Sequence, residues 1–317
     1  MGKKPRLLLF GMSFATCFST VHAFALEGVV ASIKPVHSLV SAVMEGVSEP
    51  QLLVSGAGSP HTYSMRPSEA QMLEQAKVVF WIGSGLETFL AKPLNTLAGE
   101  ARVVALADTP GLSLLDTREG GTFAEHSHDH AEAHAHDHEE DHDHDEGHEH
   151  HAHGNKDMHI WLDPENARAM VRQIAATLSD ADPENAAAYE ENADAVEGRL
   201  DALTREVAEA LAGVTDRPFV VFHDAYHYFE DRFDLSAAGS ITVSPEVLPG
   251  AQRLQEIRNK IEELNAACVF SEPQFEPKLV DVVVEGTNAR AGVLDPLGAD
   301  LADGPDLYFT LISNAAR

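Results

Sequence analysis

Short apolar runs alternate with helical patterns along the first third of the chain. Such runs, bounded by turn residues and separated by helix-length segments, are typical of βαβ units with a parallel sheet. The segments between them, such as 34–46 and 85–98, carry apolar residues at helical spacing. The predicted strands are "VVASI" (29–33), "QLLVS" (51–55), "KVVFWIG" (77–83) and "RVVAL" (102–106).

A long helix is predicted from Pro183 to about Ala212. Its apolar residues recur every three or four positions, which gives one stripe along a helix of about 28 residues and roughly 40 Å. A helix of that length is longer than one lobe needs, so it could run along two lobes. The stripe consists of Tyr189, Ala193, Val196, Leu200, Leu203, Val207 and Leu211.

A second α/β series follows the long helix. Residues 218–233 read as a strand entering a helix, and 249–264 as an amphipathic helix. Three further strands are predicted at 237–243, 267–273 and 290–298. The stretch "KLVDVVVEGT" fits either a helix or a strand. The similar order of elements in both halves predicts two α/β lobes, each with a mainly parallel sheet.

The "SPHTYSMRPSEAQ" stretch (59–71) places His61 in a loop before a helix. Ser68 as N-cap and Gln71 at the third helical position would form a capping box. This pattern fixes the C-terminal side of the His61 loop. A histidine there is equally compatible with a plain loop residue, so the rest of the chain has to decide.

Composition and the N-terminus narrow the function classes. The 317 residues hold 51 Asp and Glu against 22 Lys and Arg, which disfavours nucleic acid and anionic membranes as partners. A basic start, a short apolar run and the small residues of "AFA" (23–25) predict a signal peptide over 1–25 and export to the periplasm. Cleavage after Ala25 is expected, with "VHA" (21–23) as an alternative. The mature chain keeps Cys268 alone, which reads as a buried small apolar residue.

Residues 126–153 contain 12 histidines and 10 acidic residues but no large apolar residue. Such a composition cannot bury enough apolar surface to offset the entropy of ordering, so disorder is predicted. Clustered imidazoles and carboxylates indicate metal handling.

Three further histidines share one context, the carboxyl end of a predicted strand or an extended segment before a helix. They are His61, His159 and His223. Ligands of open α/β sheets bind at that edge, and three imidazoles with one oxygen make a tetrahedral Zn²⁺ site. A metal site is therefore one interpretation of these three histidines. His37 and His227 lie at helical positions and read as structural.

Four stretches resemble the zinc-binding subunits of bacterial ABC zinc importers, within the metal-binding family of periplasmic solute-binding proteins. These are "SPHTYSMRPSEA", "DMHIWLDPENA", "FHDAYHYFE" and "LDPLGADL", in family order. The resemblance spans nearly all of the mature chain. The internal run rich in histidine and acidic residues is also typical of the zinc branch.

The resemblance implies two α/β lobes joined by one long rigid helix, with Zn²⁺ in the cleft between them. The expected boundaries are 26–182 for the first lobe, 183–212 for the linking helix and 213–317 for the second lobe. The expected partner is an ABC permease in the inner membrane, with a periplasmic zinc chaperone as a further candidate. A monomer is expected.

The resemblance also implies that His61, His159 and His223 bind the metal. Some relatives carry an additional glutamate ligand just before the first histidine, where this chain has Pro60. Asp295 matches a carboxylate ligand of manganese-binding relatives, so Asp295 or a water is the candidate fourth ligand. Asp295 could equally cap the turn before Pro296. Some zinc relatives form a disulfide with the cysteine at the Cys268 position, and the expected partner cysteine is missing here.

Three other functions remain open from the residues. Three histidines with an open position also suit a zinc-dependent hydrolase, for which Asp224 and Glu272 are candidate bases. Both are more simply groups that orient an imidazole. A manganese-binding homologue is a second alternative, although imidazole-rich ligand sets favour zinc. A metal store based on residues 126–153 is a third, against which the organised α/β remainder argues.

Overall fold

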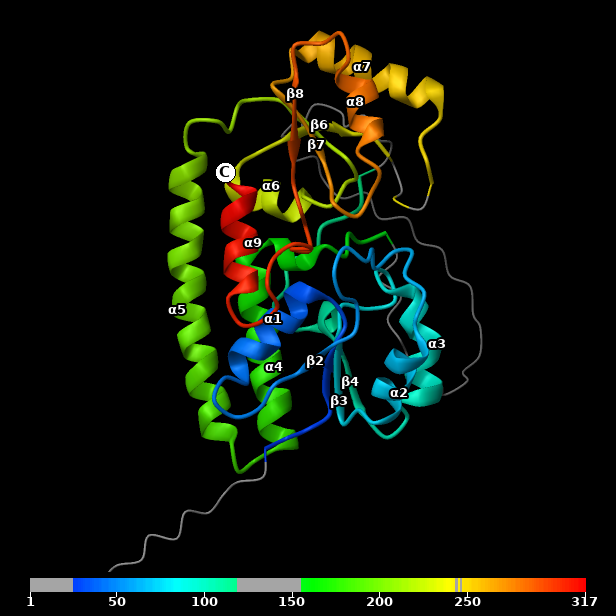
Figure 1. Ribbon diagram of the computed structural model, residues 1–317. Helices are drawn as coiled ribbons and strands as arrows, with labels where there is room; N and C mark the ends of the chain where they lie inside the picture. Colours follow the sequence, from blue (N-terminus) through cyan, green and yellow to red (C-terminus); the bar gives the residue numbers. More distant parts are fainter. Residues whose placement is uncertain (1–24, 119–154, 243–244, 246) are drawn as a thin grey trace, which may run out of the picture.

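The computed structural model describes residues 25–118, 155–242, 245 and 247–317. Its described part contains two four-stranded sheets, stacked one above the other in Figure 1, and every strand pair is parallel. Two α/β lobes with parallel sheets are therefore confirmed. The predicted signal segment, Ala25 apart, and the run 126–153 lie outside the described residues.

The first sheet has the order β2-β1-β3-β4. β1 and β3 are buried along their whole length, as expected for central parallel strands covered on both faces. The strands are β1 (Val29–Ala31), β2 (Gln51–Leu52), β3 (Val78–Trp81) and β4 (Arg102–Ala105), followed by the short helix η1 (Leu106–Asp108). The accompanying helices are α1 (Lys34–Val43), α2 (Pro67–Glu74), α3 (Thr88–Leu97) and, after the short helix η2 (Ile160–Leu162), α4 (Pro164–Ala181).

The second sheet repeats this order as β6-β5-β7-β8. The stretch "KLVDVVVEGT", which the sequence leaves open, forms a helix that buries Val280 and Val283. The strands are β5 (Phe219–Val221), β6 (Ala237–Ser240), β7 (Cys268–Ser271) and β8 (Arg290–Val293). The helices are α6 (His227–Phe233), α7 (Ala251–Leu264) and α8 (Lys278–Val284).

The long helix is α5 (Ala186–Leu211), which connects the two lobes in the chain and runs along one side of the molecule (Figure 1). All seven residues of the predicted stripe are buried. The helix begins three residues later than predicted. Asp182 accepts hydrogen bonds from the side chains of Asn185 and Tyr189, and this turn precedes the first helical residue.

The last helix, α9 (Leu307–Ala315), packs against α1 and α5 and so returns to the first lobe. The Tyr308 hydroxyl donates to the Trp161 carbonyl at 2.8 Å, and the Tyr308 N–H donates to Ser38 Oγ at 2.9 Å. The sequence boundaries assign this helix to the second lobe. The chain therefore crosses between the lobes more than once.

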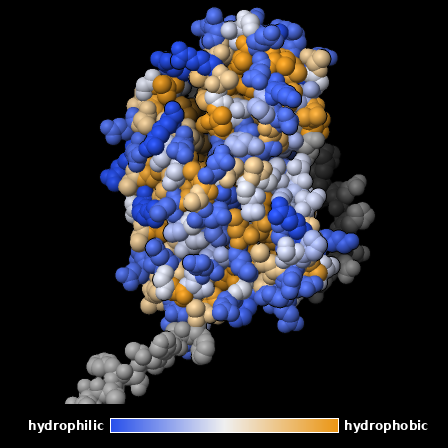
Figure 2. Space-filling model, in the orientation of Figure 1, coloured by the Kyte–Doolittle hydropathy of each residue, from blue (hydrophilic) through white to orange (hydrophobic). Residues whose placement is uncertain are grey.

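The surface matches the composition. Hydrophilic residues surround scattered hydrophobic ones on the face shown in Figure 2. Within the described residues, no helix combines the length and the apolar character needed to cross a membrane.

Candidate metal centre

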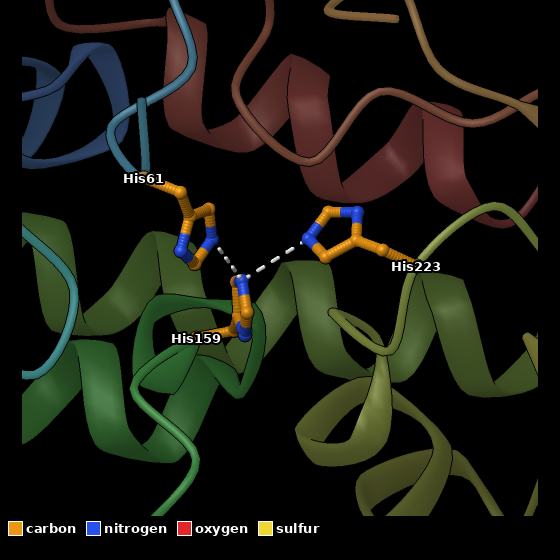
Figure 3. A group of neighbouring side chains, drawn as sticks. All are labelled: His61, His159 and His223. Atoms are coloured by element: carbon orange, nitrogen blue, oxygen red, sulfur yellow. Dashed lines mark hydrogen bonds between the residues drawn. The ribbon is translucent and has the colours of Figure 1, made fainter. Parts of the chain in front are cut away.

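His61, His159 and His223 converge between the two lobes (Figure 3). The Nε2 atom of His159 lies 3.2 Å from that of His61 and 3.3 Å from that of His223. Tetrahedral zinc with Zn–N bonds of about 2.0–2.1 Å separates its donor atoms by roughly 3.3–3.4 Å. The two distances from His159 therefore match the donor spacing of one Zn²⁺ ion, and all three ligand atoms lie within 4.8 Å of one another.

The His61 loop is held by Glu69 rather than by the predicted capping box. Helix α2 begins at Pro67, and Arg66 is its N-cap. Glu69 accepts hydrogen bonds from the Arg66 backbone N–H at 2.6 Å and from the Tyr63 hydroxyl at 2.7 Å. The Ser68–Gln71 assignment was wrong because Pro67, whose fixed φ suits the first helical position, starts the helix two residues earlier than predicted.

His159 precedes η2 and is oriented by a carboxylate two residues before it. Asp157 Oδ1 accepts hydrogen bonds from the His159 backbone N–H at 2.9 Å and from His159 Nδ1 at 2.7 Å. The bond to Nδ1 leaves Nε2 free to face a metal. After η2, Asp163 accepts a hydrogen bond from the Glu165 N–H, and Pro164 is the first residue of α4.

His223 follows β5 by two residues and is oriented in the same way from the next strand. Glu272, just after β7, accepts hydrogen bonds from His223 Nδ1 at 2.8 Å and from the His223 backbone N–H at 3.2 Å. The Phe275 ring packs edge-on against the imidazole, with ring centroids 5.6 Å apart. Helix α6 begins only at His227, so His223 lies in a loop and not at a helix start.

The electrostatic environment shifts the pKa values of His61 and His223 in opposite directions. Burial, reinforced by the neighbouring His159 and His223, lowers the pKa of His61 to about 2. Burial also acts to lower the pKa of His223, but Glu272 outweighs it and the pKa is raised above 6.5. His61 is thus neutral and ready to bind a metal, whereas His223 keeps its proton to a higher pH than a free imidazole, and a metal competes with that proton.

Zinc affinity should therefore depend on pH. His223 binds metal only when neutral, so affinity is complete above its raised pKa and falls as the pH drops through it, by about tenfold per pH unit. His61 adds nothing to this slope, since its pKa lies near 2. Chelator competition between pH 8 and 5 measures the effect. In Glu272→Gln the fall should move to lower pH, and a flat profile in the unmodified chain would contradict histidine ligation.

Asp295 lies outside the histidine group found among the described residues. Its carboxylate accepts hydrogen bonds from the backbone N–H groups of Leu297, Gly298 and Ala299, the capping role that the sequence left open. Pro60 borders the site without a donor atom, as expected.

Of the remaining candidates, Glu272 orients an imidazole, and Asp224 pairs with Arg118 instead. His37 bonds the Pro50 carbonyl, and His227 lies outside the group. Asp157 is the one site residue that the sequence reading missed. Its position two residues before His159 was the available signal.

A three-imidazole group between two parallel α/β lobes, with each buried imidazole held by a carboxylate, defines a metal-binding solute-binding protein. The family model described as zinc-uptake complex component A, periplasmic (ZnuA) matches residues 29–317. The chain belongs to this family.

Curated relatives and solved structures agree with this assignment. The chain is 61% identical over 300 residues to the high-affinity zinc uptake system protein ZnuA of Brucella abortus (strain 2308), covering 92% of this chain and 90% of that protein. Identity to the Yersinia pestis protein of the same name is 37%, covering 99% and 95%. A ZnuA crystal structure superposes with a TM-score of 0.73 at 25% identity, covering 91% and 96%. A zinc-bound ZnuA deletion mutant gives 0.72 at 25%, covering 91% and 94%.

Proposed function

We propose that this chain is the periplasmic component that captures Zn²⁺ with high affinity and delivers it to an ABC permease in the inner membrane. The observation that carries the proposal is the spacing of 3.2 and 3.3 Å between the Nε2 atoms of His61, His159 and His223. These three residues are proposed as the zinc ligands. The relatives named high-affinity zinc uptake system proteins support the direction of transport.

Zinc is the metal that both the site and the family favour. Imidazole ligands suit zinc, whereas manganese prefers carboxylate-rich sets, and Asp295 is held in a turn. The hydrolase alternative loses its candidate bases. Glu272 is bonded to His223, Asp224 is paired with Arg118, and the family consists of transport components.

The N-terminal segment supports the location. The family is periplasmic, and a signal peptide cleaved near Ala25 would export the chain to that compartment. A monomer is proposed as the working form. The permease, and a zinc chaperone that loads the site, are the proposed partners.

Removing residues 126–153 tests whether the fixed site or the histidine-rich run carries the function. The described residues on either side of 119–154 are joined by one antiparallel bridge. Asp116 pairs with Lys156, and the Thr117 N–H donates to the Asn155 carbonyl at 2.7 Å. A short linker can therefore replace the run without moving His159. The zinc-bound deletion mutant of ZnuA shows that a related chain tolerates a deletion and still holds zinc.

The shortened chain should keep one tight zinc ion and lose more than one weaker ion, because a tethered run of 12 imidazoles offers several weak sites. Titration calorimetry counts both classes. A bacterium lacking its own zinc-uptake component should regrow in chelator-treated medium with either form, and lag with the short form only under severe limitation. Loss of the tight ion would contradict the proposed function, and unchanged stoichiometry would exclude a reservoir.

A further inference from the structure

The cavity beside the three imidazoles is small, with a volume of about 10 Å³. Because a single water molecule needs about that much space, a metal bound by the histidines could take few further ligands. Zinc in proteins is satisfied by four ligands, whereas manganese favours octahedral sites with six. Three imidazoles leave an octahedral ion three ligands short, and the cavity cannot hold three more. The walls of this cavity therefore bear on which metal the site accepts.

One aromatic ring separates the cavity from solvent. Of the described apolar residues that line the cavity, Phe275 alone is half-buried, and the others lie in the protein interior. These others are Pro60, Trp161, Pro296 and Leu297. Shortening one of them would leave a hole inside the protein. Shortening Phe275 would instead join the cavity to the surrounding water.

Two neighbouring rings hold Phe275 in place. It stacks on Phe222 with ring centroids 4.7 Å apart and an angle of 11° between the planes. Phe222 is itself only 3% exposed. On its other contact, Phe275 lies edge-on to the His223 imidazole, with centroids 5.6 Å apart. Aromatic pairs at these separations are favourable, so the ring is fixed beside a metal ligand.

The turn that carries Phe275 also carries the carboxylate that orients His223. The Phe275 N–H donates to the Glu272 carbonyl at 3.1 Å. The Glu272 side chain accepts from His223 Nδ1 at 2.8 Å. One turn therefore sets both the direction of the imidazole and the position of the ring next to it.

We propose that Phe275 determines metal specificity, because its ring keeps the cavity too small for the additional water ligands that Mn²⁺ requires. An apolar wall beside a metal site controls how far solvent enters it. This steric effect adds to the chemical preference of imidazole for zinc. The inference rests on the proposed function, since it concerns how the same site selects its cargo.

The test measures Zn²⁺ and Mn²⁺ affinities separately by chelator competition. Phe275→Ala should lower the ratio of zinc to manganese affinity by about tenfold or more, the usual effect of altering a residue that surrounds the ligands. Phe275→Leu keeps most of the bulk and should restore most of the ratio. Phe309→Ala is the matched control and should leave the ratio unchanged. Phe309 is a half-buried ring in α9, outside the cavity, with the Arg199 guanidinium 3.6 Å from its centroid.

Co²⁺ supplies a second measurement that does not depend on affinity. Four-coordinate Co²⁺ absorbs visible light strongly, whereas six-coordinate Co²⁺ absorbs it weakly. The unmodified protein loaded with Co²⁺ should therefore show an intense spectrum. Phe275→Ala should show a weaker one, and Phe275→Leu should regain the intensity.

Two outcomes would overturn the inference. One is a weak, six-coordinate Co²⁺ spectrum in the unmodified protein. The other is an affinity ratio in Phe275→Ala equal to that of Phe309→Ala. Either result leaves the proposed function untouched if the unmodified protein still binds one zinc ion tightly. Failure of the unmodified protein to bind zinc tightly would instead refute the proposed function.

Discussion

Replacing His61, His159 or His223 by alanine, one at a time, should weaken zinc binding by more than about 100-fold. Losing a group that merely supports a metal ligand costs about 10- to 100-fold, and losing the ligand itself costs more. His159→Ala should have the largest effect. Its Nε2 lies next to those of both other histidines, so its loss leaves two donors on opposite sides of a gap.

Competition with a chromogenic chelator at pH 7.5 measures these affinities. His227→Ala is the matched control, because this histidine is close in sequence to His223 but outside the group. It should keep the affinity of the unmodified chain. Far-ultraviolet circular dichroism should show that all four variants fold, since the hydrophobic core clusters contain none of these histidines. Tight binding that survives in all three ligand variants would show that the site lies elsewhere.

The repetition of strands and helices was predictable because it depends on local patterns. Apolar runs such as "VVF" in β3 have the length and the β-branched content of buried parallel strands. The stripe from Tyr189 to Leu211 keeps helical spacing over about six turns, and only a helix places all of it on one face. Pairing in parallel follows from the alternation of strands with helices.

Features that depend on tertiary contacts were not predictable in the same way. Helix α9, "LYFTLISNA", was not predicted, although its buried residues Leu307, Tyr308, Leu311 and Ile312 recur at helical spacing, because the pattern covers little more than one repeat. It forms where α1, α5 and Trp161 offer a surface to cover. The residue at which α2 starts depends on which backbone N–H the Glu69 side chain binds, here that of Arg66. The sequence shows only which residues could form such a capping bond.

The candidate site likewise has a part that local sequence patterns predict and a part that depends on tertiary contacts. The sequence could nominate His61, His159 and His223 because each was placed on the edge where parallel sheets gather ligands. His159 directly precedes η2 and His223 follows β5 by two residues, whereas His61 lies in the loop between β2 and α2. The carboxylates that orient His159 and His223 differ in how far along the sequence they lie from their histidines. Asp157 is two residues from its histidine, whereas Glu272 is 49 residues away and meets His223 only because β5 and β7 pair. The hydrogen bonds of Asp295 likewise needed the folded turn.

Arg118→Met should lower the free energy of unfolding by about 3–5 kcal/mol. Arg118, on the first-lobe side of the cleft, donates to Asp224 at 2.9 Å and to Glu230 at 2.8 Å, both in the second lobe. The side chains of Arg118 and Glu230 are 9% and 3% exposed. Removing the guanidinium leaves two carboxylates without their cationic partner in a largely buried place, and breaking such a pair carries a cost of this size.

Urea unfolding of the metal-free protein measures the loss, with Arg102→Met as the matched control. Arg102 pairs with Asp180 on the surface, where the side chains are 46% and 69% exposed, and such pairs contribute about 0–1 kcal/mol. Asp224 directly follows His223, so Arg118→Met should also weaken zinc binding by displacing one ligand. Equal stability in the two variants would show that water screens the Arg118 cluster. The contacts between the lobes would then contribute little to holding His223 beside the other two histidines.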